Sequence, residues 1–266
     1  MRNLLHQIQY EYSQGGLKHI VVGSIEKLFI EMLRQSPPIY WKTAPRYFRW
    51  RSSNDVLKYQ CPPDPFKIEY VDPDDIRRRT GRPWPEHLNR RILFGKVRDG
   101  DWDKEGKLIE DSEFYHAAEK HFIDGVRWEE IDSIRQKLEG IECGSHDDYK
   151  YKDRDDLLAI YRRLDEVYDR IRQEGYLSQG ELLEEPGDMN DGLFLDTLDE
   201  VTVDVGRNGE LLHVDGIHRL TVAKLLDLNE IPVVFLIRHK EWTEYREKLC
   251  EGDEPIPDHP DLRDLK

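Results

Sequence analysis

The strongest constraint on the fold lies in the last third of the chain, where two strand-like runs flank an Asn-Gly pair. Residues 201–205 alternate with period two, and residues 211–214 follow after Gly206-Arg207-Asn208-Gly209-Glu210. Asn-Gly between two such runs is a strong hairpin signal, because both turn residues must accept a positive φ. A helix over 216–227 and a strand over 231–237 that is apolar on both faces complete the pattern. Residues 201–237 are therefore expected to form a hairpin, then a helix, then an interior strand.

Weaker sequence patterns predict a further strand and several helices nearer the N-terminus. Residues 66–71 predict a short strand that is closed by the turn Asp72-Pro73-Asp74-Asp75-Ile76. The stretch from Ser112 to Gly175 is mainly helical in pattern, with Ser112 as a cap for 114–122, an amphipathic stretch over 127–138 and a final long helix. That last helix carries one apolar stripe: Leu157, Tyr161, Leu164, Tyr168 and Ile171.

Two further helix starts are expected on either side of this region. Ser178-Gln179-Gly180-Glu181 has the spacing of a capping box. Residues 24–33 predict a helix within an N-terminal accessory segment, and the loop 184–191, which carries four acids, is expected to be exposed.

Charge narrows the range of partners. The 266 residues include 55 acids and 40 Lys and Arg, a formal net charge of −15. A strongly acidic surface repels phosphate backbones, so nucleic-acid binding would require a local basic patch. The arginines of 77–82 and 90–91 are equally consistent with a phosphate-binding face and with salt-bridge partners for the acids. The acid excess suits either a salt-rich cytoplasm or an ordinary acidic protein.

No sequence feature predicts a membrane, secretory or metal-bound protein. No apolar run approaches the ~18 residues of a membrane span, and the N-terminus lacks the apolar stretch of a signal peptide, so we expect a cytoplasmic protein. Cys61, Cys143 and Cys250 have neither metal-ligand nor redox spacing, and their odd number argues against a disulfide framework. We therefore expect three buried or indifferent thiols and no zinc site.

The corner Asp215-Gly216-Ile217-His218-Arg219 carries the clearest functional signal. The first backbone N–H groups of a helix bind phosphate, aided by the positive end of the helix dipole. His218 and Arg219 are cations in that first turn, where they are unfavourable unless an anion balances them. Arg219 can fork two phosphate oxygens, and His218 can donate a hydrogen bond or move a proton. Asp215 can cap the helix, hold Mg²⁺ or orient His218.

A plainer interpretation of the same residues remains open. Asp215 then only caps the helix, and His218 and Arg219 pair with nearby acids. Spacing alone does not separate the two interpretations.

Residues 66–76 and 200–238 together resemble the ParB/sulfiredoxin-like superfamily. The shared features are a first strand ending in an Asp-Pro turn, then helices, a hairpin and a Gly-x-His/Arg-Arg corner before a buried strand. Partition proteins have Gly-Glu-Arg-Arg at this corner. Gly216-Ile217-His218-Arg219 is closer to the Asp-Gly-His-His-Arg of the ParB-like free-serine kinases, with Ile217 in place of the first histidine.

The resemblance implies an α+β fold with a small mixed sheet and packed helices. It divides the chain into an accessory segment over 1–62, a ParB/sulfiredoxin-like domain over 63–240 with a helical insertion at about 100–150, and a C-terminal helix and tail over 241–266. It also implies a nucleotide (ATP, ADP or CTP) with Mg²⁺, cradled by Asp215, Gly216, Ile217, His218 and Arg219, with Asp215 as the metal ligand.

Two activities of the superfamily do not fit these residues. Sulfiredoxin requires a cysteine where this chain has Ile217. Only 47 residues follow Arg219, which leaves too little chain for the DNA-binding and dimerisation domains of a partition protein.

Two hypotheses of different class remain. The first is an enzyme that transfers a phosphoryl group from a nucleotide to a small hydroxyl substrate, with a carboxylate taking the hydroxyl proton. Candidates for that base are Asp72, Asp74 and Asp75 after the first strand, or Asp101 and Asp103 in the Gly-Asp-Trp-Asp loop; turn capping is the alternative role for all five. The second is a non-catalytic, nucleotide-dependent regulatory module, associated with DNA through the arginines of 77–91.

Overall fold

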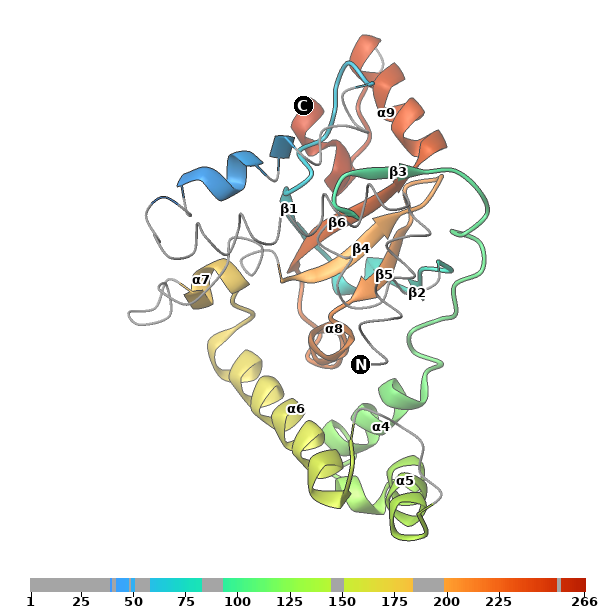
Figure 1. The fold of residues 1–266 in the computed structure, drawn as a ribbon, viewed down its shortest axis with the longest axis vertical. Helices are drawn as coiled ribbons and strands as arrows, with labels where there is room; N and C mark the ends of the chain where they lie inside the picture. Colours follow the sequence, from blue (N-terminus) through green and yellow to red (C-terminus); the bar gives the residue numbers. More distant parts are fainter. Residues whose placement is uncertain are drawn as a thin grey trace, which may run out of the picture.

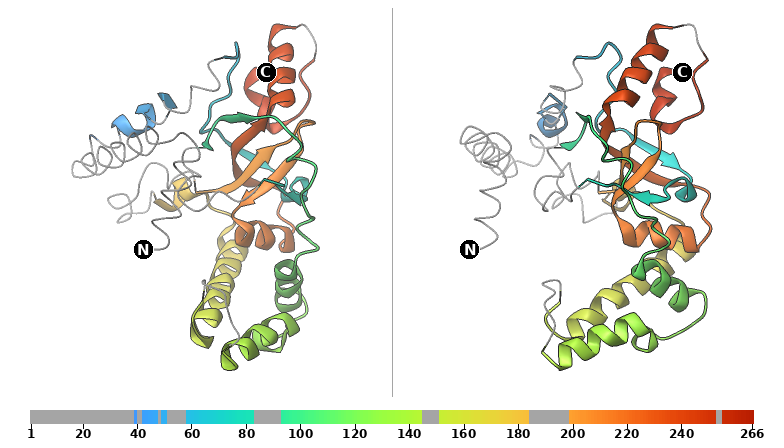
Figure 2. Two further views of the ribbon diagram at one scale, coloured as in Figure 1. Left: turned by 45° about the vertical axis from the view of Figure 1, so that its right-hand side comes forward. Right: turned by 90° about the vertical axis from the view of Figure 1, so that its right-hand side faces the viewer.

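The computed structural model describes residues 39, 42–47, 49–50, 58–82, 93–144, 151–183, 199–252 and 255–266. A twisted sheet forms the centre of this part of the chain, with a C-terminal helical region at one end and a group of long helices projecting from the other (Figures 1 and 2). The helix expected at 24–33, the loop 184–191 and the pair Arg90-Arg91 lie outside the described residues.

The sheet has six described strands: β1 (Ile68–Val71), β2 (Arg78–Arg79), β3 (Lys96–Arg98), β4 (Val201–Val205), β5 (Leu211–Asp215) and β6 (Ile231–His239). Their order is β1-β6-β4-β5-β2, and β3 pairs with the last residues of β6, beyond β1. β6 is antiparallel to β1 and parallel to β4, while β5 is antiparallel to β4 and parallel to β2. The sheet is therefore mixed, and the expected α+β class is confirmed.

β6 is the interior strand that its sequence predicted. All nine of its residues are buried, and it pairs along both sides. Pro232, which cannot donate to a ladder, lies opposite Tyr70 of the short strand β1. The expected hairpin is also present, since the Gly206 N–H bonds to the Glu210 carbonyl at 2.9 Å. Its turn differs from the expected Asn-Gly form, because Gly209 has a φ of +86° but Asn208 does not have a positive φ.

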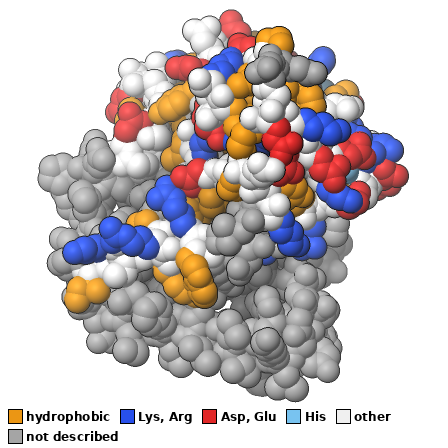
Figure 3. All heavy atoms as spheres, turned by 90° about the horizontal axis from the view of Figure 1, so that it is seen from above, with side chains coloured by type: hydrophobic (Ala, Val, Ile, Leu, Met, Phe, Trp, Pro, Cys, Tyr) orange, Lys and Arg blue, Asp and Glu red, His pale blue; other side chains and the backbone are white. Residues whose placement is uncertain are grey.

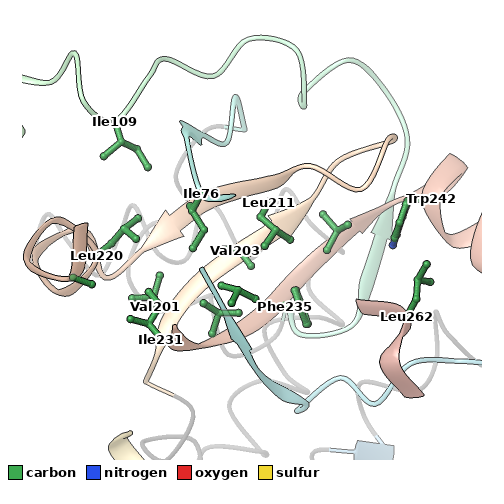
Figure 4. Close-up of a cluster of buried hydrophobic side chains, with 14 of the residues drawn as sticks. Ile76, Ile109, Val201, Val203, Leu211, Leu220, Ile231, Phe235, Trp242 and Leu262 are labelled. Atoms are coloured by element: carbon green, nitrogen blue, oxygen red, sulfur yellow. The ribbon is translucent and has the colours of Figure 1, made fainter. Parts of the chain in front are cut away.

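Each face of the sheet has its own core. One face packs alternate valines of β4 against Leu220 and Ala223 of helix α8 (Ile217–Leu225), and the same cluster reaches Trp242 and Leu262 near the C-terminus (Figure 4). The other face packs Val234 and Leu236 of β6 against apolar residues from 44–94: Ala44, Phe66, Leu93 and Phe94.

The projecting helices are α4 (Glu113–Phe122), α5 (Asp132–Glu142) and α6 (Arg154–Glu174). Ser112 caps α4 by accepting from the Tyr115 N–H, and α6 ends at Gly175, whose φ is +82°, both as predicted. The stretch expected over 127–138 is divided instead, because a short 3-10 turn η2 (Trp128–Glu130) precedes α5. The helical region thus extends beyond 100–150, to the end of α6.

A short helix, α7 (Gln179–Leu183), returns the chain to the sheet. Its capping box is formed as predicted: the Ser178 N–H donates to Glu181 Oε2 at 2.7 Å, and the Glu181 N–H donates to Ser178 Oγ at 3.2 Å.

The C-terminal region joins the same core. Helix α9 (Lys240–Glu251) and the 3-10 turn η4 (Pro260–Leu265) are held by the buried Asp261, which accepts from Arg238 and from the Trp242 indole. Acidic and basic side chains are interspersed on the face of the molecule seen from this end (Figure 3).

The expectation of three unpaired thiols was wrong. Cys61 and Cys250 form a disulfide with their Cα atoms 6.4 Å apart, which is within the usual range for such bonds. Cys143 is unpaired and exposed. The two bonded cysteines are 189 residues apart in sequence, so no local spacing signals the bond.

Candidate functional site

The corner is built by the end of β5 and the start of α8. Gly216 lies between them with a φ of +85°, in the left-handed region that favours glycine. A Cβ at this position would lie 3.1 Å from the Cα of Val201 in the neighbouring strand β4. Both the backbone conformation and the close approach of the two strands therefore require glycine here.

The first turn of α8 has the charge pattern of an anion site. Its N-cap residue, Gly216, has no side chain to cap it, and the turn contains no acid, whereas His218 and Arg219 both lie in it. Oδ1 of Asp215 accepts from the adjacent Gly216 N–H at 2.7 Å. His218 is exposed, with its ring centroid 4.9 Å from that of Phe114 in α4.

Arg219 turns toward a buried acid at the start of β4. Its Nη1 lies 3.7 Å from Oε2 of Glu200, a residue with no exposed surface. That separation makes an ion pair but not a hydrogen bond, and neither of these two atoms has a hydrogen-bond partner. Of the two interpretations of Arg219, pairing with an acid is thus present in the structure, at the edge of the corner.

Burial raises the pKa of Glu200 to about 7, although the Gln179 N–H and the charge of Arg219 act in the opposite direction. A carboxyl group that changes protonation near neutrality is suited to proton transfer. Sequence reasoning missed Glu200, because an acid next to a strand usually lies in solvent and the folding of α7 against it is not visible locally.

A small pocket adjoins this ion pair. Its volume is about 120 Å³, and its wall includes Ile171 of α6, Tyr176 and Leu177 of the following loop, Leu182 of α7 and Arg219. Burial raises the pKa of the Tyr176 hydroxyl above its ordinary value, against the opposing charge of Arg219. The hydroxyl oxygen has no hydrogen-bond partner.

The aspartates after β1 share this edge of the sheet. Val71 at the end of β1 lies opposite Ile231 at the start of β6, and Thr202 near the start of β4 lies opposite Asp215. Asp72 caps the 3-10 turn η1 (Pro73–Asp75) by accepting from the Asp74 N–H at 2.8 Å.

The neighbours of Asp72 differ in their contacts. Asp74 pairs with Lys224 in the last turn of α8 at 3.0 Å, whereas Asp75 is exposed. Capping is thus the observed role of Asp72, and Asp74 is bound to the far end of α8.

The structure does not bring Asp101 and Asp103 to the corner. Both accept from Arg207 in the hairpin turn, at the opposite end of β4 and β5. A five-residue strand separates the two ends, roughly 15 Å. Burial alone would raise the pKa of Asp103, but hydrogen bonds from the side chain and N–H of Arg207 lower it to about 2. Such a carboxylate is a weak base.

Two arginines of the basic segment 77–82 are also bound to acids. Arg78 donates to Glu210, with a distance of 2.7 Å from its Nε to Oε1. Arg82 pairs at 2.7 Å with Asp204, which is fully buried. For these two residues the salt-bridge interpretation describes the structure.

Comparisons of the chain with models of protein families, with curated proteins and with solved structures found no match. Within the described residues, no three His, Cys, Asp or Glu side chains come together as a metal-ion site. None of the described helices has both the length and the apolar character required to span a membrane.

Proposed function

We propose that this chain binds the phosphates of a nucleotide at the first turn of α8, on a fold related to the ParB/sulfiredoxin-like superfamily. The observation that carries the proposal is the start of α8: a left-handed glycine at the N-cap position, no acid in the first turn and two basic residues in it. A helix stabilised only by its own sequence would have the opposite charge pattern at this end. The order hairpin, corner helix and buried strand supports the relation to the superfamily.

The ion pair of Arg219 is compatible with an incoming phosphate. With the pKa of Glu200 near 7, protonation of this carboxyl group costs little free energy at neutral pH. Loss of the charge on Glu200 leaves the guanidinium available to a phosphate oxygen. The nucleotide would then take the place of Glu200 as the counter-charge of Arg219.

Phosphoryl transfer to a small hydroxyl substrate is the activity that we propose for this site. Mg²⁺ bound with the nucleotide would supply charge neutralisation, and Asp215 offers it one carboxylate at the corner. Asp72 and Asp75 lie at the same edge of the sheet and are the candidates to accept the hydroxyl proton, whereas Glu200 is protonated in the state that frees Arg219 and is not one of them. Asp101 and Asp103 lie at the opposite end, and we assign them no part.

Replacing His218 by Glu tests the phosphate site. An acid in the first turn complements the helix dipole, so the ligand-free variant should be as stable as the wild type or more stable, by about 0.3–1 kcal/mol. The same acid should repel phosphate and abolish the thermal shift given by ATP, ADP, CTP or GTP with Mg²⁺. His116→Glu is the matched control, because His116 is also an exposed helical histidine, in α4.

The outcomes separate the hypotheses. At a hundred times its Kd, a ligand stabilises the wild type by ~2.7 kcal/mol, a shift that is easily measured. No shift with any nucleotide, in low or in molar KCl, or equal shifts in His218→Glu and the wild type, would contradict the proposal. Turnover of the bound nucleotide would indicate the enzyme, and binding without turnover the regulatory module.

A further inference from the structure

The pocket beside Arg219 shares this side chain with the phosphate site proposed above, but its other wall residues have no part in that site. Its wall residues come from the end of α6, the following loop, α7 and the first turn of α8, where Arg219 contributes its side chain. Its apolar wall residues include Ile171, Leu177 and Leu182, and its polar ones are Arg219, Tyr176, Arg170 and Gln179.

Three of the described buried polar atoms that lack a well-formed hydrogen bond lie at or next to the pocket. Nη1 of Arg219 and the hydroxyl of Tyr176 belong to wall residues and lie near each other without good hydrogen-bond geometry. The third is Oε2 of Glu200, the ion-pair partner of Arg219. A buried polar group without a partner destabilises the folded state, and a ligand that supplies the missing hydrogen bond removes this cost.

The charges of the wall favour an anion. The lining residues include no acid, and their two arginines differ: Arg170 bonds to Glu174 of its own helix at 3.2 Å, whereas Arg219 has the long contact with Glu200 and lies beside the Tyr176 hydroxyl. The unsatisfied guanidinium N–H of Arg219 is therefore the group that a ligand would meet. A carboxylate is the planar partner that fits an arginine fork.

The volume limits the size of the ligand. An apolar cavity of about 150 Å³ holds benzene, so a pocket of about 120 Å³ accommodates a ligand of about five or six heavy atoms. We propose that the pocket binds a small branched aliphatic carboxylate of this size, with its carboxylate on Arg219 and Tyr176 and its hydrocarbon against Ile171, Leu177 and Leu182. Because Arg219 is also the proposed phosphate ligand, the carboxylate and a nucleotide phosphate should compete for its guanidinium, although the remaining contacts of the two ligands differ.

Isobutyrate, which has six heavy atoms, is the probe, and ligand-observed NMR titration is the measurement. We expect saturable binding by the full chain. Isobutanol and isobutylamine, which share the hydrocarbon but not the negative charge, should bind at least tenfold more weakly.

Two variants test the place of binding. Leu182→Trp should fill the pocket and reduce isobutyrate affinity at least tenfold. Leu226→Trp replaces another half-buried leucine, outside the pocket, and should leave the affinity within twofold of the wild type. Tyr176→Phe removes only the hydroxyl and should weaken binding without a change in the circular dichroism spectrum.

The pH dependence of isobutyrate binding, which Glu200 should cause, distinguishes a ligand-binding pocket from a merely structural one. The groups acting on it are Arg219, Asp199, Glu181 and the Gln179 N–H, with the hydroxyls of Tyr176 and Tyr70 nearby. A carboxylate ligand competes with ionised Glu200 for Arg219, so isobutyrate should bind more tightly at pH 6 than at pH 8. Glu200→Gln should remove this difference.

No saturable binding at either pH by folded protein would overturn the proposal, as would equal binding of the three probes or unchanged affinity in Leu182→Trp. Nucleotide shifts measured on the same samples keep the two sites apart. His218→Glu should still bind isobutyrate, and Leu182→Trp should still respond to nucleotide.

Discussion

Glu200 is the residue whose charge depends most on its surroundings at this edge of the sheet. It has no exposed surface, and its partners are the N–H of Gln179 and, at 3.7 Å, the guanidinium of Arg219. Burial disfavours the ionised form more than these two partners favour it, so its pKa rises to about 7. A single side chain thereby makes the stability of the fold depend on pH in a range where most acids have finished titrating.

The sign of this dependence follows from proton binding. Between the ordinary pKa of a glutamate and about 7, the folded chain holds a proton on Glu200 that the unfolded chain has lost, so stability falls as pH rises. Glu200→Gln imitates the protonated form at every pH. Its stability relative to the wild type should therefore increase between pH 5 and pH 8, on the order of 2–3 kcal/mol.

Urea unfolding of both proteins at the two pH values measures this change. Asp103→Asn is a useful comparison, because the pKa of Asp103 is lowered to about 2 and its effect should be constant over the same range. A constant difference between Glu200→Gln and the wild type would show that Glu200 titrates normally.

At the scale of elements, α8 is the helix through which the edge of the sheet is organised. Its first turn forms the corner with β5, its third residue contacts Glu200 at the start of β4, and its last turn pairs Lys224 with Asp74 after β1. The helix thus contacts the ends of three strands. α7 completes the arrangement, since the N–H of its first residue, Gln179, donates to Glu200.

These elements differ in how far the sequence predicts them. The hairpin, α8, β6 and the end of α6 follow from local signals: an Asn-Gly turn, an apolar stripe, an apolar run and Gly175. The three residues of β3 give no such signal, because Lys96, Val97 and Arg98 form a strand only by pairing with the end of β6. The candidate site divides in the same way. The corner is predicted from the sequence, because its residues are contiguous. Glu200 and the pocket are not, because they depend on how α6 and α7 return to the sheet.

Loss of the α7 cap should be measurable. Ser178→Ala removes the side-chain acceptor of the Glu181 N–H and the partner of Glu181 Oε2, so we expect a loss of about 1 kcal/mol in unfolding free energy. Ser133→Ala, at a half-buried position inside α5, is the matched control and should not destabilise. Chemical denaturation of the two variants measures the difference; equal stabilities would mean that α7 is held by its packing alone.

At the scale of the molecule, the segment around β1 is bonded to the C-terminal turn η4. Lys67 just before β1 bonds to Asp264 in η4 at 3.2 Å, and Arg263 bonds to the carbonyl of Tyr70 in β1 at 2.8 Å. The disulfide between Cys61 and Cys250 adds a covalent link. The C-terminal helix and tail therefore stabilise the sheet as part of one core.

The disulfide should contribute measurably to stability. A cross-link that closes a long loop restricts the unfolded chain, and removal typically costs on the order of 2–4 kcal/mol. Dithiothreitol should therefore lower the melting temperature of the wild type, and Cys61→Ser should melt at the reduced temperature with or without reductant. Cys143→Ser, at the exposed unpaired cysteine, should behave as the wild type. A melting temperature unaffected by reductant would contradict this role of the disulfide.

The same bond determines how the protein would respond to a pulling force. If the chain is held before Cys61 and after Cys250, the load passes through the two sulfur atoms and bypasses the intervening backbone. Roughly 60 nm of contour length is thereby shielded from extension. Only the segments before Cys61, including the part around Ala44, and after Cys250 can then peel away, so the strands between the two cysteines would stay together under tension until the sulfur–sulfur bond is reduced.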